Sequence, residues 1–233
     1  MSAQLPLVLR WPPDQRFETF VVGANGVAFE LARKAASDAA ASWLYLGGAP
    51  GSGRTHLLIA TCAAAAQAGR AAQYVSLAAL SAPRAGTIRA LGGSDVLALD
   101  DIDVIAADEA AEHALFDLYN RCRADASTVL FAAGAAPGRV GFMLPDLVSR
   151  LAACTQATLR PLSEDERREA LRARAVARGI ALDDAVLDWL FVHHCRDLGA
   201  LGALLDRIDR ASLAAKRRVT VPFLRELLAD SGP

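Results

Sequence analysis

Up to residue 161, short apolar runs alternate with segments whose apolar residues recur at helical spacing. The five runs cover residues 42–48, 71–77, 95–101, 128–134 and 155–161. The helical patterns cover residues 27–38, 55–67, 108–123 and 144–151. Strands that alternate with helices usually form a parallel sheet with both faces covered. The pattern therefore predicts an α/β fold in which a five-stranded parallel sheet lies between helices.

After Pro161 the strand pattern stops, and only helical patterns follow. Ser163 and Glu166 have the spacing of a capping box at the start of a charged helix. This part of the chain is therefore expected to form a separate all-α domain. The predicted organisation is an N-terminal tail over 1–15, an α/β core over 16–161 and a helical domain over 162–233.

The composition fits a folded protein and excludes several other classes. The chain has 233 residues, of which 53% are hydrophobic, and a formal net charge of −1, so its overall field does not favour nucleic acid or an anionic membrane. No segment resembles a signal peptide or has the roughly 18 apolar residues of a membrane span, which predicts a cytoplasmic protein with no membrane partner. The four cysteines are widely spaced, without a C-x-x-C pair, and predict neither a disulfide framework nor a zinc site.

The segment GGAPGSGRTHLL, residues 47–58, has the spacing of a phosphate-binding loop. Gly48, Gly53 and Thr55 match the pattern G-x-x-x-x-G-K-[ST], whereas Arg54 stands where lysine is usual. The loop follows a predicted strand and opens a predicted helix, so its N–H groups can face phosphates and the Thr55 hydroxyl can ligate Mg²⁺. The candidate nucleotide contacts are Gly48, Pro50, Gly51, Ser52, Gly53, Arg54, Thr55 and His56.

Arg54 leaves two interpretations open. Arginine keeps the positive charge of lysine but is longer, planar and forked, so it can pair with phosphate oxygens while sitting less compactly beside a γ-phosphate. The substitution therefore predicts nucleotide binding without efficient turnover. The alternative is a loop that no longer binds nucleotide.

The stretch DVLALDDID, residues 95–103, places acidic residues at the end of a buried strand. Asp100 and Asp101 fit a Walker B element, in which one carboxylate holds Mg²⁺ through water and the next can polarise an attacking water. We therefore expect a Mg²⁺ site formed by Thr55, Asp100 and Asp101. The alternative is that the two aspartates only cap the end of the strand.

Together, the loop, the acidic strand end and the C-terminal helices resemble the AAA+ class of nucleotide-binding proteins, and more narrowly the DnaA/Hda family. The resemblance covers almost the whole chain and rests on QLPLVL near the start, APGSGRTHLL in the loop, and LRPLSEDERREALRARAVARGIAL and DRIDRASLAAKRRVTVPFLRELL at the end. It implies a P-loop AAA+ core followed by an all-α lid, with ADP or ATP and Mg²⁺ as cofactors and ADP favoured. The helix-turn-helix domain with which the replication initiator DnaA binds DNA is not expected here.

The resemblance also implies partners. Hda-like regulators act on ATP-bound DnaA while docked on the sliding clamp, the DNA polymerase beta subunit, and so meet DNA through the clamp. QLPLVL is similar to their docking peptide, with Gln4 as a hydrogen-bonding anchor and Leu5, Leu7 and Leu9 as apolar plugs for a preformed pocket. By pattern alone, an edge strand or a tail packed on the core explains this segment equally well.

Arg150 lies near the end of the predicted helix 144–151, where AAA+ proteins carry an arginine finger. The resemblance implies that its guanidinium enters the nucleotide site of a neighbouring DnaA and stabilises charge on the transferred phosphoryl group. The alternative is a surface arginine that binds helix-terminal carbonyls or pairs with Asp146. Because AAA+ neighbours assemble head to tail, a homo-oligomer that hides Arg150 is a further arrangement to consider.

Two places depart from the family pattern. The fourth predicted strand ends in Ala133, Gly134 and Ala135, where the resemblance implies a polar side chain that senses the γ-phosphate. For the lid arginine that would reach the phosphates, Arg196 is the available candidate, and our alignment places Gly199 at that position. Either Arg196 substitutes or the contact is missing. Both departures argue against ATP hydrolysis by this chain alone.

Phe20, Val21 and Val22 precede the first strand and are candidates for the wall that covers the adenine base; they fit equally well as core residues. Two functions follow from the sequence. The first is a regulator that promotes ATP hydrolysis on DnaA without being an efficient ATPase itself. The second is a self-sufficient AAA+ ATPase, such as a helicase loader or a transposition helper, which would need the missing γ-phosphate sensors.

Overall fold

The computed structural model describes residues 11–12, 14–193, 198–215 and 218–229. The chain divides into two compact units, Met1–Pro161 and Leu162–Pro233. The first unit holds the sheet, and the regular elements described in the second are all helices.

A five-stranded parallel sheet forms the centre of the first unit, which confirms the predicted fold class. Its strands are β1 (Leu44–Gly48), β2 (Ala72–Ser76), β3 (Val96–Asp100), β4 (Thr128–Ala133) and β5 (Thr155–Leu159). The order across the sheet is β2-β3-β4-β1-β5, and every neighbouring pair is parallel. The segments that follow β1, β3 and β4 therefore leave the sheet at the same edge, which is where parallel sheets form their ligand sites.

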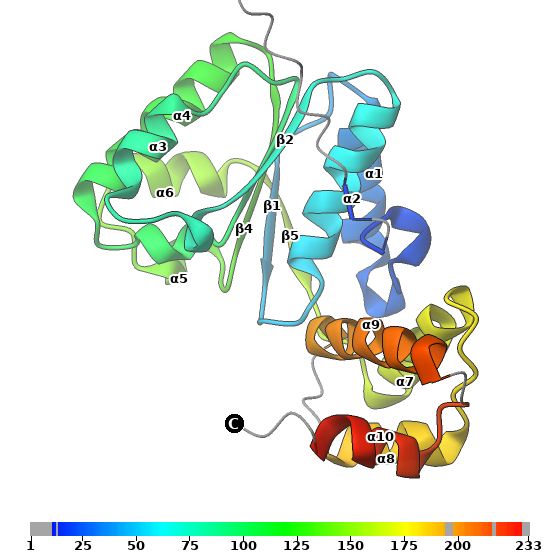
Figure 1. Ribbon diagram of the computed structural model, residues 1–233. Helices are drawn as coiled ribbons and strands as arrows, with labels where there is room; N and C mark the ends of the chain where they lie inside the picture. Colours follow the sequence, from blue (N-terminus) through cyan, green and yellow to red (C-terminus); the bar gives the residue numbers. More distant parts are fainter. Residues whose placement is uncertain (1–10, 13, 194–197, 216–217, 230–233) are drawn as a thin grey trace, which may run out of the picture. The chain divides into compact units, whose positions relative to one another are not determined.

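Helices cover both faces of this sheet, with α1 and α2 on one face and α3, α4, α5 and α6 on the other (Figure 1). The helices are α1 (Gly26–Ser37), α2 (Arg54–Gln67), α3 (Arg84–Ala90), α4 (Glu109–Ala124), α5 (Pro137–Val140) and α6 (Pro145–Ala152). Short 3₁₀ segments lie at η1 (Phe17–Thr19), η2 (Gly23–Asn25), η3 (Leu77–Ala79) and η4 (Ile102–Ile105).

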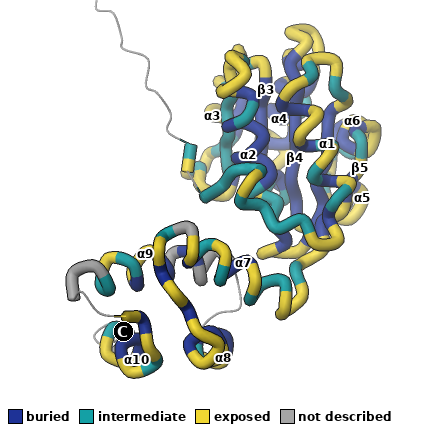
Figure 2. The backbone as a smooth tube through the Cα atoms, turned by 90° about the vertical axis from the view of Figure 1, so that its right-hand side faces the viewer, coloured by how far each residue is buried: buried dark blue, intermediate teal, exposed yellow. Residues whose placement is uncertain are grey.

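Successive strand residues point to opposite faces, so each central strand contributes to two apolar cores. Tyr45, Leu97 and Phe131 pack in the core that includes α3, α4 and α6. Leu46 and Leu130 pack in the core that includes α1 and α2. Figure 2 shows β3 and β4 buried in the middle of the unit. The edge at which the segments after β1, β3 and β4 leave the sheet is thus held between two layers of close-packed side chains.

Helix α3 has no counterpart among the predicted helices. Its sequence, RAGTIRA, contains a glycine and too few apolar positions to establish a helical period. Ala85 and Ile88 are nevertheless buried in the core shared with α4. Tertiary packing rather than local propensity therefore stabilises this helix.

Glu112 of α4 is a fully buried carboxylate, 0% exposed. Its oxygens accept hydrogen bonds from the backbone N–H groups of Ala107 at 2.9 Å, Met143 at 2.9 and 3.0 Å, and Leu144 at 2.8 Å. Leu144 is the N-cap residue of α6. Hydrogen bonds from N–H groups to a carboxylate are stronger than those between neutral groups, so Glu112 fixes the point at which α6 begins.

Replacing Glu112 by alanine is expected to lower the free energy of unfolding by about 3 kcal/mol, because several buried N–H groups lose their acceptor at about 1–3 kcal/mol each. Chemical denaturation of the purified variant measures this loss. Glu109→Ala, an exposed glutamate one turn earlier in α4, is the control and is expected to change stability by about 0.5 kcal/mol or less. Equal stability of the two variants would contradict this role of Glu112.

The second unit consists of α7 (Glu164–Ala177), α8 (Asp184–His193), α9 (Leu198–Ala215) and α10 (Val221–Ala229). The predicted capping box is present, because Ser163 Oγ accepts from the Glu166 N–H and the Glu166 carboxylate accepts from the Ser163 N–H. Leu171, Leu187, Leu205 and other apolar residues from these helices form one core. In the described part of the chain, no helix has the length and apolar character to cross a bilayer.

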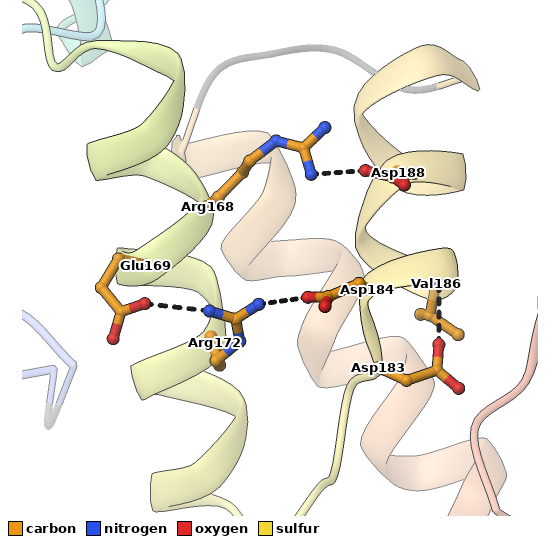
Figure 3. A network of polar contacts seen from close by, with 7 residues as sticks. All are labelled: Arg168, Glu169, Arg172, Asp183, Asp184, Val186 and Asp188. Carbon is orange, nitrogen blue, oxygen red and sulfur yellow. Dashed lines mark hydrogen bonds and ion pairs between the residues drawn. The ribbon is translucent and has the colours of Figure 1, made fainter.

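Ion pairs between α7 and α8 lie on the surface of this unit (Figure 3). Arg168 of α7 pairs with Asp188 of α8, and Arg172 of α7 pairs with Asp184 of α8 as well as with Glu169 of its own helix. Exposed pairs of this kind contribute about 1 kcal/mol or less each. The apolar core therefore provides most of the stability of the bundle, and these pairs add little to it.

Candidate nucleotide-binding site

The loop between β1 and α2 is too tightly folded to accept side chains at its glycines. A Cβ atom at Gly48 would lie 2.6 Å from Ser52 Oγ and 2.9 Å from the carbonyl oxygen of Leu159. Gly51 and Gly53 have left-handed φ values of 76° and 98°, which residues with a Cβ rarely adopt. The α2 helix starts directly after Gly53, which has no side chain to cap it. The N–H groups of its first turn are therefore available to an anion.

Thr55 and Asp100, which the sequence assigns to the same site, are in direct contact. Thr55 Oγ1 donates a hydrogen bond of 2.6 Å to Asp100 Oδ2, and Tyr74 Oη donates one of 3.0 Å to the same oxygen. Tyr74 belongs to β2, the strand next to β3. The sequence reasoning missed Tyr74, because its role depends on the pairing of β2 with β3 and on no local motif.

Burial raises the pKa of the Asp100 carboxyl, and the neighbouring Asp101 charge acts in the same direction, while hydrogen bonds from Thr55 and Tyr74 oppose the shift. Burial and the negative charge of Asp100 in turn raise the pKa of Tyr74. The tyrosine therefore stays protonated and acts as a hydrogen-bond donor to the carboxylate.

The oxygen atoms of Thr55 and Asp100 are suitable ligands for Mg²⁺, which prefers hard oxygen donors and keeps several waters. The described residues contain no group of three or more His, Cys, Asp or Glu side chains able to hold a metal ion by themselves. A Mg²⁺ ion at this place would thus take most of its ligands from water and from a bound phosphate. That is the usual arrangement in sites that bind nucleotides with magnesium.

Arg54 and Asp101 face each other beside this pair. The distance from Arg54 Nη2 to Asp101 Oδ1 is 3.8 Å, and the arginine side chain is only 11% exposed. Arg54 Nη1 is buried, and it has no hydrogen-bond partner among the residues that the structure describes. A buried guanidinium nitrogen without an acceptor is costly, and a phosphate oxygen is an acceptor that would remove the cost. Asp101 also adopts a left-handed φ of 54° and accepts a hydrogen bond from Ser76 Oγ.

A third aspartate, which the sequence reasoning did not select, completes the polar edge. Asp103 Oδ2 accepts a 3.0 Å hydrogen bond from the backbone N–H of Gly134, directly after β4. Tyr45 Oη donates to the Ala135 carbonyl oxygen at 2.7 Å. Burial and the Asp103 charge raise the pKa of Tyr45, and the Arg54 charge opposes the shift. Asp103 and Arg54 lie close together, because Oδ2 and Nη1 are 3.0 and 4.0 Å from the position of a Cβ at Gly134.

The predicted adenine wall lies against the phosphate-binding loop at Phe20. Its ring is in contact with Gly53, where a Cβ would lie 2.9 Å from Phe20 Cε2, and it stacks on Phe29 with ring centroids 5.7 Å apart. Val21 and Val22 are half-buried. Phe20 thus packs against the core and also borders the loop, and its role at the adenine base stays a prediction.

Asn25 and His56 hold the segment that leads to the wall. The Asn25 amide donates to the Arg160 carbonyl oxygen at 2.9 Å and accepts from the Arg160 N–H at 2.8 Å, which ties the segment to the end of β5. His56 Nε2 lies 2.8 Å from the carbonyl oxygen of Arg16. The His56 ring therefore faces the N-terminal segment, while the backbone N–H of His56 belongs to the first turn of α2.

Arg150 is exposed in the last turn of α6. It forms no ion pair with Asp146 within the described ranges. Leu147 and Leu151 of the same helix are buried in the core on the α4 side of the sheet, opposite to the face that α2 covers. Arg150 and the phosphate-binding loop are therefore separate features of this unit.

Several predicted residues lie outside the described residues. These are Gln4, Leu5, Leu7 and Leu9 of the N-terminal segment and Arg196 of the helical unit.

A parallel sheet of this order, with a glycine-rich loop after β1, acidic residues after β3 and a helical unit after β5, defines a P-loop domain of the AAA+ class. Residues 12–157 match the family described as bacterial DnaA ATPase domain. Residues 164–228 match the family described as Hda, lid domain. The chain belongs to the DnaA/Hda family of AAA+ proteins.

Several solved structures share this fold. Domain III of the replication initiation protein DnaA from Thermotoga maritima is similar with a TM-score of 0.76 at 21% identity, covering 95% of this chain and 98% of that one. DnaA from Aquifex aeolicus, solved bound to AMPPCP, has a TM-score of 0.66 at 19% identity, covering 88% and 71%. The Thermotoga maritima RuvB Holliday junction branch migration motor has a TM-score of 0.61 at 19% identity, covering 89% and 69%.

The raised pKa of Asp100 predicts a pH-dependent effect of Asp100→Asn. In the wild type, the folded state holds the Asp100 proton more tightly than the unfolded state, so ionisation of this group lowers the free energy of unfolding as pH rises above the ordinary carboxyl value of about 4. Asp100→Asn has no carboxyl to ionise at this position, so its free energy of unfolding does not fall for this reason. Its stability relative to wild type is expected to improve as pH rises towards neutrality, as measured by thermal unfolding in the absence of nucleotide and metal.

The same variant is expected to lose the contribution of Mg²⁺ to nucleotide affinity, because a neutral amide is a poor ligand for this ion. Asp117→Asn, an exposed aspartate of α4, removes the same charge and serves as the control. For the pH prediction, a stability difference between Asp100→Asn and wild type that does not change with pH would contradict a raised pKa of Asp100.

Proposed function

We propose that this chain is a nucleotide-binding regulator of replication initiation that promotes hydrolysis of ATP bound to DnaA. Membership of the DnaA/Hda family supports this function, together with the match of the helical unit to the Hda lid. The observation that carries the proposal is a complete phosphate-binding loop in contact with Asp100 on the same unit as an exposed Arg150. The proposed site of this regulation is the cytoplasm.

The nucleotide is ADP or ATP, with ADP the expected resident. The loop N–H groups and Arg54 bind the phosphates, and Phe20, Val21 and Val22 border the base. Thr55, and Asp100 through water, would hold Mg²⁺, which would neutralise phosphate charge when bound. The chain itself is a poor ATPase, because Ala133, Gly134 and Ala135 offer no polar side chain at the end of β4.

Arg150 acts on the partner. Its guanidinium enters the ATP site of DnaA, where it stabilises the charge that develops on the transferred phosphoryl group, an effect of about 10³ to 10⁵ in rate. An arginine can do this only if its head is free to leave its own surface, and Arg150 is exposed at a helix end. The start of that helix is held by the hydrogen bonds of Glu112 with Met143 and Leu144, which limits the positions that Arg150 can sample.

QLPLVL binds the sliding clamp, and the clamp brings the regulator to DNA. Gln4 supplies the hydrogen bond to the clamp, and Leu5, Leu7 and Leu9 fill its apolar pocket. A homo-oligomer in which Arg150 meets the nucleotide site of a second copy would switch the regulator off.

Arg150→Ala is expected to reduce hydrolysis of DnaA-bound ATP by at least about 10³-fold, since the finger provides most of the rate. The measurement follows conversion of ATP to ADP on DnaA in the presence of clamp-loaded DNA and this protein. Arg33→Ala, an exposed arginine of α1, is the matched control and leaves the rate unchanged. Rapid hydrolysis by this protein without DnaA would instead favour the self-sufficient ATPase.

The double variant Gln4→Ala/Leu7→Ala is expected to weaken clamp binding by about 100-fold or more, because losing an anchoring hydrogen bond and a buried leucine costs about 3 kcal/mol together. Surface plasmon resonance with immobilised clamp measures the affinity. Nucleotide affinity of the same variant should stay at the wild-type value. Equal clamp affinities of variant and wild type would exclude this peptide as the docking element.

A further inference from the structure

Gly134 follows β4 at the place where a polar side chain is expected to face the terminal phosphate, and the space in front of it is filled. A Cβ atom at Gly134 would lie 3.0 Å from Asp103 Oδ2, and the same oxygen accepts the Gly134 N–H at 3.0 Å. Gly134 is not among the glycines with a left-handed φ. A side chain at position 134 would therefore have to displace the Asp103 carboxylate, which occupies the space in front of the glycine.

Asp103 reaches this space from η4, the turn after β3, and not from β4. The turn begins at Asp101, whose left-handed backbone redirects the chain at the end of the strand. Asp103 is therefore directed across the end of β4, the strand that pairs with β3. The side chain that β4 lacks is thus supplied by its neighbour in the sheet.

Arg54 borders the same space. Its Nη1 atom lies 4.0 Å from the position of a Cβ at Gly134, and this is the buried nitrogen that has no partner in the described part of the chain. Its Nη2 atom faces Asp101 at 3.8 Å. Two carboxylates and one guanidinium therefore share this end of the site, with a summed formal charge of −1.

We propose that Asp103 is the residue of this chain that distinguishes a nucleoside diphosphate from a triphosphate. The proposal rests on nucleotide binding in the proposed site. In P-loop proteins the loop cation lies beside the β- and γ-phosphates, so the groups around Arg54 meet the end of the phosphate chain. A triphosphate brings the negative charge of its γ-phosphate to a place that already holds the carboxylates of Asp101 and Asp103. A diphosphate lacks this phosphate, so the Arg54 guanidinium can still offset the charge of the two carboxylates.

The test compares the affinities of ADP and ATP, both with Mg²⁺, by isothermal titration calorimetry of the full chain. Asp103→Asn keeps the size of the side chain and an oxygen that can accept from Gly134, but it removes the charge. It is expected to raise the affinity for ATP relative to ADP by about tenfold, the size typical for relief of like charges in a partly solvated site. Asp117→Asn loses one exposed charge of α4 and is expected to keep the wild-type ratio.

A swap of side chains tests whether the position itself carries the effect. Asp103→Ala should shift the ratio in the same direction as Asp103→Asn. Adding Gly134→Asp in that background returns a carboxylate to the vacated space from β4, and the double variant is expected to recover the wild-type preference. Circular dichroism and thermal unfolding establish that each variant is folded.

The outcomes separate this inference from the function on which it rests. An unchanged ATP-to-ADP ratio in Asp103→Asn, with wild-type ADP binding intact, overturns the role of Asp103 and leaves the nucleotide site in place. If Asp103→Ala/Gly134→Asp has the same ratio of ATP to ADP affinity as Asp103→Ala, a carboxylate in the space in front of Gly134 does not set the preference. A wild-type protein that binds neither nucleotide overturns both proposals.

Discussion

The hydrogen bond from Thr55 to Asp100 joins two segments that are not neighbours in the sheet. Thr55 stands in the helix after β1, Asp100 ends β3, and β4 lies between these strands. The contact is made across the end of β4, and only parallel pairing brings the three strand ends to one edge. The residues that follow β4 therefore form the floor of the site, and their small side chains leave room for Arg54 and Asp103.

Patterns local in the chain predicted most of the architecture. The five strands, the helices before and after the phosphate-binding loop, and the capping box at Ser163 all follow from spacing within one element, and the structure has each of them. The sequence also assigned Thr55 and Asp100 to one predicted Mg²⁺ site, and the structure places their side chains in contact. The exposed position of Arg150 in a short helix is equally a local property.

The remaining site residues depend on strand order and on turns, which spacing does not encode. Tyr74 reaches Asp100 only because β2 pairs with β3, and Asp103 reaches Gly134 only because the turn at Asp101 bends left-handed. Glu112 shows no local sign of its role, because a glutamate in a helix usually faces water. The N–H groups of Met143 and Leu144, which donate hydrogen bonds to its carboxylate, lie far along the chain. Apolar packing likewise stabilises α3, whose sequence has too little helix propensity to predict a helix.

The contacts of His56 create a mechanical path from the amino-terminal end to the phosphate-binding loop. Arg16 donates from its Nη2 atom to the Trp11 carbonyl oxygen at 3.0 Å, and its own carbonyl oxygen lies 2.8 Å from His56 Nε2. His56 is in the first turn of α2, and Phe20 lies against Gly53. Polar contacts thus connect Trp11 to the turn that carries Thr55. A tether attached at that end would therefore load two places together: the first turn of α2, through Arg16 and His56, and the apolar core against which Trp11 packs.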